Sequence, residues 1–180
     1  MTAIMLCGRQ DRSLPREISR VLSVCGGVCL DTDEEISLKS DCRFLLVQKD
    51  RPPRWRTNAG ICVLPPDTGV FSHWQVPTGF VAVAPSDAPA ALRMLERQGT
   101  PTVTCGMSAA DTVTLSSIHE SRAVVCLQRT LSTLSGGKVE PGDFPVGLAA
   151  PVSPYGLMAA MAILLLAGED PAVALTDALV

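Results

Sequence analysis

Six charged or polar residues follow apolar runs of this sequence and are the best candidates for binding a ligand: Arg9, Asp11, Lys49, Arg51, Ser86 and Asp87. If the runs are parallel strands, their carboxyl ends lie at one edge of a sheet, where open α/β sheets bind ligands. Arginine forms bidentate hydrogen bonds with phosphate and carboxylate groups, so the expected ligand is a small anion. The alternative is that these residues are solvated loop charges.

Standard nucleotide-binding motifs are absent. A P-loop requires G-x-x-x-x-G-K-[ST] between a strand and a helix. The sequence after the first apolar run, Gly8-Arg-Gln-Asp-Arg-Ser13, has one glycine and no lysine next to a hydroxyl residue. Gly136-Gly137-Lys138 continues with a valine and no predicted helix, and G-x-G-x-x-G does not occur. We therefore expect no nucleotide cofactor.

Two further kinds of site are also disfavoured. Gly106-Met-Ser108-Ala-Ala follows a predicted strand but lacks the final glycine of a nucleophile elbow, and His119 is too close to complete a triad. We interpret this segment as a turn. Cys25 and Cys29 have no paired cluster of further ligands, so a structural zinc site is not expected.

The seven cysteines indicate the compartment. Their number is odd and most lie in apolar runs, which is typical of buried free thiols in a reducing cytosol. The start of the chain lacks the pattern of a signal peptide. Residues 144–168 carry no charge, but three prolines limit the helix there to about residues 155–167, shorter than the roughly 20 residues of a membrane span. The prediction is a cytoplasmic protein without a membrane anchor.

Composition predicts one globular domain over residues 1–180. The chain is 47% hydrophobic and 18% charged, with a net charge of −3. That balance argues against general nucleic-acid binding, which needs a basic surface. One basic loop offers a less favoured alternative, nucleic-acid contact through four residues: Arg51, Arg54, Trp55 and Arg56.

A second long loop contains Phe71, His73 and Trp74, which either form a contact patch or fold back on the core.

The elements needed to position these residues follow from periodicity. Strands are expected at residues 2–7, 28–30, 43–48, 60–64, 80–84, 102–105, 112–118, 122–134 and 138–148, and helices at 13–25, 88–98, 154–167 and 171–179. Asp87 is expected to cap the second helix. Strands that alternate with helices predict an α/β fold: a mostly parallel, Rossmann-like sheet with helices on both faces. The later part predicts an antiparallel β-hairpin section, turning at residues 135–137, and C-terminal helices.

From residue 80 onward the sequence resembles a known family, the middle domain of Mur ligases and their folylpolyglutamate synthase relatives. Three segments correspond to family strands and the turns that follow them: Phe80–Asp87, Gly99–Gly106 and Ala110–Ile118. The Gly136-Gly137 hairpin and the small-residue helix Gly156–Gly168 resemble later elements of that domain. The similarity covers about half of the chain and, more weakly, its first strand and helix. It implies the fold of an ATP-binding domain.

The sequence departs from the family at the ATP site. The P-loop lysine and hydroxyl have no counterpart, and Ser153-Pro-Tyr-Gly-Leu157 replaces the family's His-Asn-x-x-Asn-Ala. A glutamate-rich magnesium site and the flanking domains are not recognisable either. The leading hypothesis is a Mur-ligase-like module that has lost ligase chemistry and binds a protein partner or a second copy. The alternative is an enzyme or binder for the anionic ligand described above.

Overall fold

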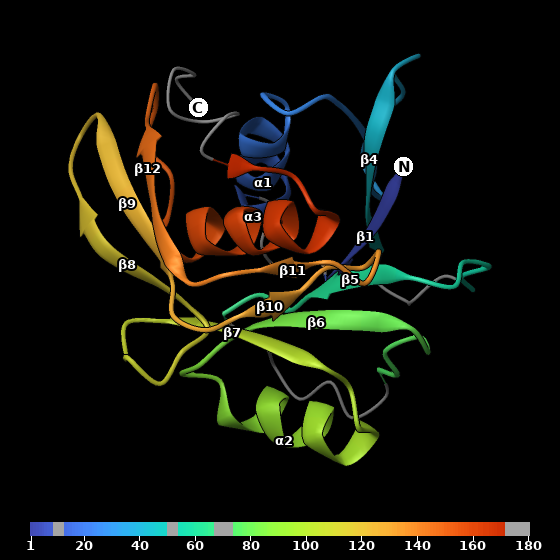
Figure 1. The fold of residues 1–180 in the computed structure, drawn as a ribbon. Helices are drawn as coiled ribbons and strands as arrows, with labels where there is room; N and C mark the ends of the chain where they lie inside the picture. Colours follow the sequence, from blue (N-terminus) through green and yellow to red (C-terminus); the bar gives the residue numbers. More distant parts are fainter. Residues whose placement is uncertain (9–12, 50–53, 67–73, 172–180) are drawn as a thin grey trace.

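A ten-stranded sheet forms the centre of the computed structural model, which describes residues 1–8, 13–49, 54–66 and 74–171. Its strands are β1 (Thr2–Cys7), β2 (Gly27–Asp31), β3 (Ile36–Ser37), β4 (Cys42–Lys49), β5 (Gly60–Val63), β6 (Phe80–Pro85), β7 (Thr102–Gly106), β8 (Val113–Ile118), β9 (Arg122–Leu127) and β12 (Gly142–Gly147). They are arranged in the order β12-β9-β8-β7-β6-β5-β1-β4-β2-β3 (Figure 1).

The middle of the sheet is parallel. Strands β2, β4, β1, β5, β6, β7 and β8 run in one direction, and β3, β9 and β12 are antiparallel to their neighbours. Parallel strands are buried on both faces, which explains their continuous apolar runs. The predicted fold class is therefore confirmed. The carboxyl ends of β1, β4, β5, β6 and β7 lie at one edge.

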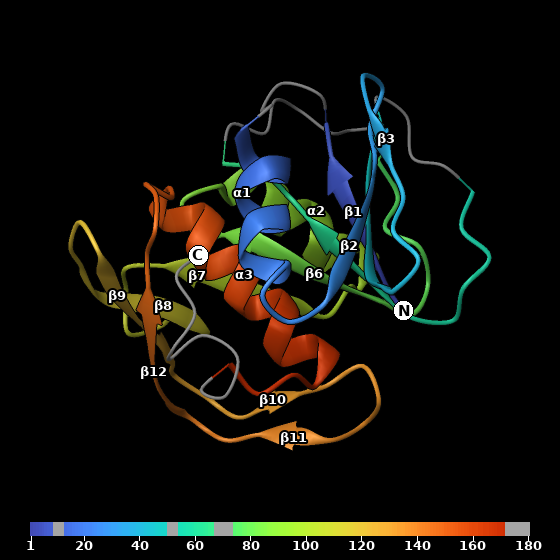
Figure 2. The same ribbon diagram turned by 90° about the horizontal axis from the view of Figure 1, so that it is seen from above.

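Helices cover both faces of the sheet (Figures 1 and 2). The first face carries α1 (Ser13–Leu22) and α3 (Pro154–Ala167), which pack against each other. Helix α3 has the predicted bounds: Ser153 caps its start, and Gly168, with φ 78°, ends it. It is buried almost all round, since it lies between the sheet, α1 and a hairpin. In the described part of the chain, no helix is long and apolar enough to span a membrane.

The second face carries α2 (Pro89–Gln98) and a separate apolar cluster. The prediction that Asp87 caps this helix was wrong. The capping position is Ala88, and no side chain bonds the first turn. Pro89 suits the first helical position, which leaves Asp87 one residue outside it. Trp74 is only 8% exposed in this cluster, so its loop folds back on the core at that point. Phe71 and His73 lie outside the described residues.

The β-rich section divides more finely than its sequence predicts. The expected strand 122–134 becomes β9 and β10 (Leu131–Ser132), and 138–148 becomes β11 (Lys138–Val139) and β12. The chain leaves the sheet between these pieces so that β10 and β11 can form a two-stranded hairpin over α3, where the Leu134 N–H donates to the Leu166 carbonyl (2.8 Å). Strand β3 was not predicted. The predicted helix 171–179 falls almost wholly outside the described residues.

Candidate functional site

Three of the six predicted ligand-binding residues can be placed. Lys49 is the last residue of β4, and Ser86 and Asp87 directly follow β6. All three are therefore at the carboxyl edge, as predicted. However, β1 and β5 lie between β4 and β6, which separates the two groups by three strand spacings, about 14 Å. Arg9, Asp11 and Arg51 lie outside the described residues. The structure thus does not gather Lys49 and Ser86 around one small ligand.

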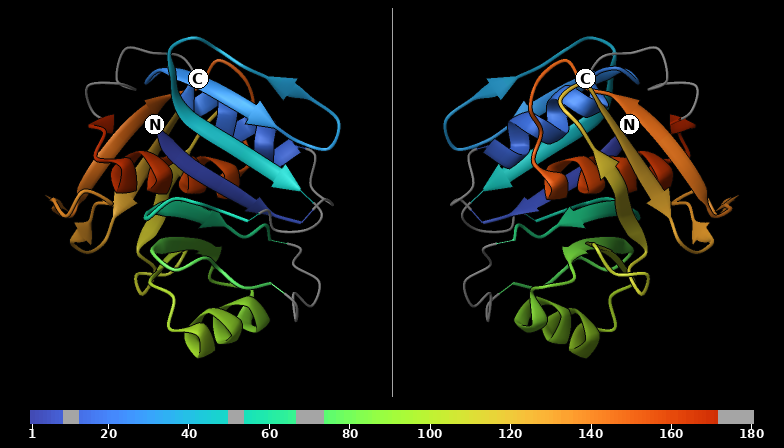
Figure 3. Two further views of the ribbon diagram at one scale, coloured as in Figure 1. Left: turned by 90° about the vertical axis from the view of Figure 1, so that its right-hand side faces the viewer. Right: turned by 90° about the vertical axis from the view of Figure 1, so that its left-hand side faces the viewer.

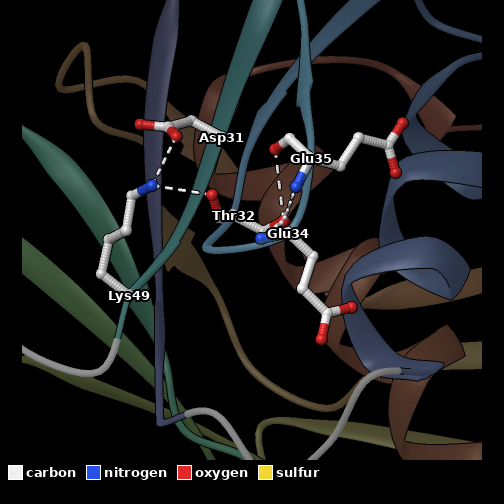
Figure 4. A network of polar contacts seen from close by, with 5 residues as sticks. All are labelled: Asp31, Thr32, Glu34, Glu35 and Lys49. Atoms are coloured by element: carbon white, nitrogen blue, oxygen red, sulfur yellow. Dashed lines mark hydrogen bonds and ion pairs between the residues drawn. The ribbon is translucent and has the colours of Figure 1, made fainter.

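Lys49 already has internal partners (Figure 4). Its Nζ lies 2.6 Å from Asp31 Oδ1 and donates to the carbonyl oxygen of Thr32 at 2.8 Å. The pairing arises because β2 and β4 are neighbours, with Asp31 opposite Val47. An anion that binds Lys49 would have to compete with the Asp31 carboxylate.

A cavity of about 250 Å³ lies between the start of α1 and the turn that joins β2 to β3. Its described lining includes three acidic residues of that turn and only one cation: Pro15, Arg16, Leu30, Thr32, Asp33, Glu34, Glu35 and Gln48. The Thr32 hydroxyl accepts hydrogen bonds from the backbone N–H groups of Glu34 and Glu35, which holds the turn (Figure 4). None of these lining residues was among the predicted site residues. The sequence pattern that could have indicated this acidic turn is four acids within the five residues 31–35, directly after a predicted strand.

Ser86 belongs to a tightly packed polar group at the ends of β6 and β7. Its backbone N–H donates to the Cys105 carbonyl (3.0 Å), and its hydroxyl lies against Gly106. Asp111, only 4% exposed, also touches Gly106 and accepts from the Ser108 N–H (3.0 Å). Burial, followed by the nearby Asp111 charge, raises the pKa of the Cys105 thiol. These contacts join the loop after β6 to the loop after β7. The neighbouring residue Asp87 is exposed.

The tryptophan of the basic loop is half-buried against the sheet. The indole N–H of Trp55 donates to Met5 Sδ (3.2 Å), and its ring packs against Phe80 with centroids 5.6 Å apart. Arg54 and Arg56 on either side are exposed. Base stacking needs a free aromatic face. Trp55 instead fixes this segment to the sheet.

The start of α1 is the position where a P-loop would hold phosphates. Gly8, with φ 83°, directly follows β1. Counted from Gly8, the motif places its lysine at position 14 and its hydroxyl residue at position 15. Leu14 stands at the first position and is 3% exposed in the core, and a buried proline, Pro15, stands at the second. Neither side chain can bind a phosphate or its magnesium ion.

The start of α3 is fixed against both α1 and the sheet edge. The Ser153 hydroxyl donates to Glu17 Oε2 (2.5 Å) and accepts from the Gly156 N–H (3.0 Å). A Cβ on residue 156 would lie 2.2 Å from the same carboxylate oxygen, so a larger residue there would displace the Glu17 side chain from Ser153. Tyr155 donates from its hydroxyl to the carbonyl oxygen of Leu64, just after β5, with the Val83 carbonyl at 3.4 Å.

The partners of this tyrosine lie at β5 and β6, beside the point between β1 and β5 where the chain order reverses. From β1 the chain passes through α1 to β2 and β4 on one side, then crosses to β5 on the other. In open α/β sheets, ligands enter the crevice at such a switch point. Burial raises the pKa of Tyr155 well above that of a free phenol. Tyr155 is therefore a neutral, hydrogen-bonded side chain beside the switch point.

Solved structures share this fold. MurF from Acinetobacter baumannii aligns with a TM-score of 0.60 at 14% identity, over 99% of this chain and 46% of MurF. The murein peptide ligase Mpl from Psychrobacter arcticus gives 0.59 at 12%, over 97% and 46%. E. coli FolC, solved with DHPP and ADP, gives 0.58 at 10%, over 99% and 57%. The chain has a Mur-ligase-like fold and spans about half the length of these ligases. No protein-family model and no curated protein matches the sequence.

Proposed function

We propose that this chain is a Mur-ligase-like domain without ATP-dependent ligase chemistry, which works as a binding or regulatory module. The observation that carries the proposal is the Tyr155 hydroxyl bonded to the Leu64 carbonyl beside the switch point of the sheet. Among the described residues, phosphates that entered there would meet this neutral, buried side chain.

The start of α1 supports the same proposal. Phosphate-binding loops combine free backbone N–H groups, a lysine and a hydroxyl residue at a helix N-terminus. Here Leu14 belongs to the apolar core, and Pro15 has no N–H. The Glu17 carboxylate, one turn further on, faces α3 and adds negative charge near the position that phosphates would take.

An ATP-consumption assay tests the loss of ligase chemistry. The full chain is incubated with ATP, magnesium, free amino acids and UDP-sugars, and the release of ADP is followed. The proposal expects no ADP above a protein-free blank. ADP release that falls in the variants Gly8→Ala and Ser13→Ala would come from this chain and would overturn the proposal. ADP release that is unchanged in both variants would come from a contaminating ATPase, and this outcome would agree with the proposal.

A second candidate function is the binding of a small anion near the ends of β1 and β4. The observation in its favour is register: Cys7 and Lys49, the last residues of these strands, lie opposite each other, so the loops that carry Arg9, Asp11 and Arg51 start side by side. Ser86 and Asp87 would form a second, separate contact. Titration with inorganic phosphate and pyrophosphate tests this function. An affinity that is unchanged in Arg9→Ala and Arg51→Ala would contradict it.

A further inference from the structure

In the described part of the chain, no strand pairs with the outer side of β3 at one end of the sheet. The sheet ends in β12 on one side and in β3 on the other (Figure 3). Proteins usually block such edges with proline, charge or a covering element. Strand β12 contains Pro145, which has no N–H to offer, whereas β3 contains no proline.

The backbone of this edge is directed outward at Ile36 and Leu38. Glu35 accepts from the Thr32 N–H (2.8 Å), Ser37 is paired with Leu30, and the Lys39 N–H points to Cys29 Sγ (3.2 Å). Because these alternate residues face β2, the N–H and C=O groups of Ile36 and Leu38 face away from it.

The side chains at the two outward positions are apolar. Ile36 is 69% exposed and Leu38 is 75% exposed, and their i, i+2 spacing places them on one face of the strand. They are two of the five large hydrophobic residues exposed in the described chain. The opposite face of the same segment carries two exposed residues of opposite charge, Glu35 and Lys39.

We propose that β3 pairs with β3 of a second copy of this chain, antiparallel, about a two-fold axis that passes beside Ser37. In this register Ile36 lies opposite Leu38 of the second copy, and Glu35 lies opposite its Lys39. The two-fold axis repeats each pair, which gives two apolar contacts and two ion pairs, with outward peptide groups opposite one another.

The charge pattern favours this register and this partner. Moving the second copy by two residues in either direction would remove both Glu35–Lys39 pairs, because Glu35 would then lie opposite Asp41 or opposite Ser37. A basic peptide would match Glu35 but would repel Lys39. The segment is thus complementary to itself, as an isologous interface requires. The paired segment is short, and small interfaces are generally weak, so the dimer should form only at high protein concentration.

Charge exchange tests the proposal in sedimentation experiments on the full chain, from about 10 μM to about 1 mM. The wild-type chain should dimerise with increasing concentration. Glu35→Lys alone and Lys39→Glu alone should each weaken the dimer about tenfold or more, whereas an equimolar mixture of the two variants should restore it. Glu96→Lys and Lys138→Glu, exposed charges elsewhere, are matched controls that should leave the dimer unchanged. Unchanged melting temperatures would show that both variants fold.

A cross-link provides an independent measurement. Ser37 would lie directly opposite Ser37 of the second copy in a pair without mutual hydrogen bonds, where Cα atoms are about 4.5 Å apart and a disulfide can close. Ser37→Cys should form a covalent dimer in air that a reductant reverses, and Ser132→Cys should not. A wild-type chain that remains monomeric at about 1 mM would overturn the proposal. So would charge variants that dimerise as well as wild type.

Discussion

The hydroxyl of Tyr155, in the first turn of α3, donates a hydrogen bond to the carbonyl oxygen of Leu64, the residue after β5. The residues are 91 positions apart in the chain, and their contact fixes α3 to the sheet beside its switch point. The Ser153–Glu17 hydrogen bond fixes the same end of α3 to α1. Both contacts fix the start of α3 to its neighbours near the carboxyl edge of the sheet.

Removal of the Tyr155 hydroxyl should destabilise the protein. Tyr155→Phe leaves the Leu64 carbonyl without this donor, and an unsatisfied buried acceptor costs about 1–3 kcal/mol. Urea unfolding should show a lower free energy of unfolding with an unchanged slope. Thr57→Val removes an exposed hydroxyl that bonds the Ala59 carbonyl and should change stability by less than about 0.5 kcal/mol. Equal stabilities of Tyr155→Phe and wild type would show that the contact contributes nothing.

Gly106→Ala should be costly because no space exists for its methyl group. A Cβ there would lie 2.0 Å from Ser86 Oγ and 2.4 Å from Asp111 Oδ2. Such overpacking typically costs about 1–3 kcal/mol, measurable as a lower melting temperature. Gly142→Ala in β12 is the control, since nothing lies within 4 Å of its Cβ position and no loss is expected. Adding Ser86→Ala should recover part of the loss in Gly106→Ala, and a double variant no better than the single one would contradict this explanation.

The protein should lose stability at alkaline pH. Burial raises the pKa values of Cys7, Cys105 and Tyr155, so these groups stay protonated in the folded chain after they ionise in the unfolded chain. The unfolded state then binds fewer protons, and stability falls as pH rises. The loss should begin near the unfolded thiol pKa of about 8.5 and reach about 1.4 kcal/mol per thiol for each further pH unit.

A matched variant separates this effect from general alkaline damage. Cys105→Ala should show a shallower decline of unfolding free energy between about pH 8.5 and 10.5 than wild type, even if it is less stable at pH 7. Parallel curves for the two proteins would mean that Cys105 does not contribute to the pH dependence.

Local signals in the sequence were sufficient for the best-predicted elements. Helix α3 has its predicted bounds, because a charge-free run sits between Pro154 and Gly168. Strand β3 has only two residues, too few to show the alternation of apolar and polar residues that indicates a strand. The turn at Thr32 holds it in place. The break between β9 and β10 depends on packing over α3, which the continuous apolar sequence does not reveal.

The site was less predictable because it depends on which strands are neighbours. The sequence placed Lys49 at a strand end but not beside Asp31, since that pairing requires β2 next to β4. The Tyr155–Leu64 contact joins distant segments and has no local signal. The missing P-loop residues were readable directly, because that motif is local. The role of Arg9, Asp11 and Arg51 in ligand binding stays a prediction.

Calorimetric titration of the full chain with ATP and magnesium is the sharpest test of whether a nucleotide site remains. We expect no saturable heat up to about 1 mM nucleotide, since binding at that level corresponds to only about −4.1 kcal/mol. Tyr155→Phe should behave the same way. Saturable binding of about one ATP per chain in the micromolar range, lost in Gly8→Ala, would show that a nonstandard phosphate site remains and would overturn the proposed function.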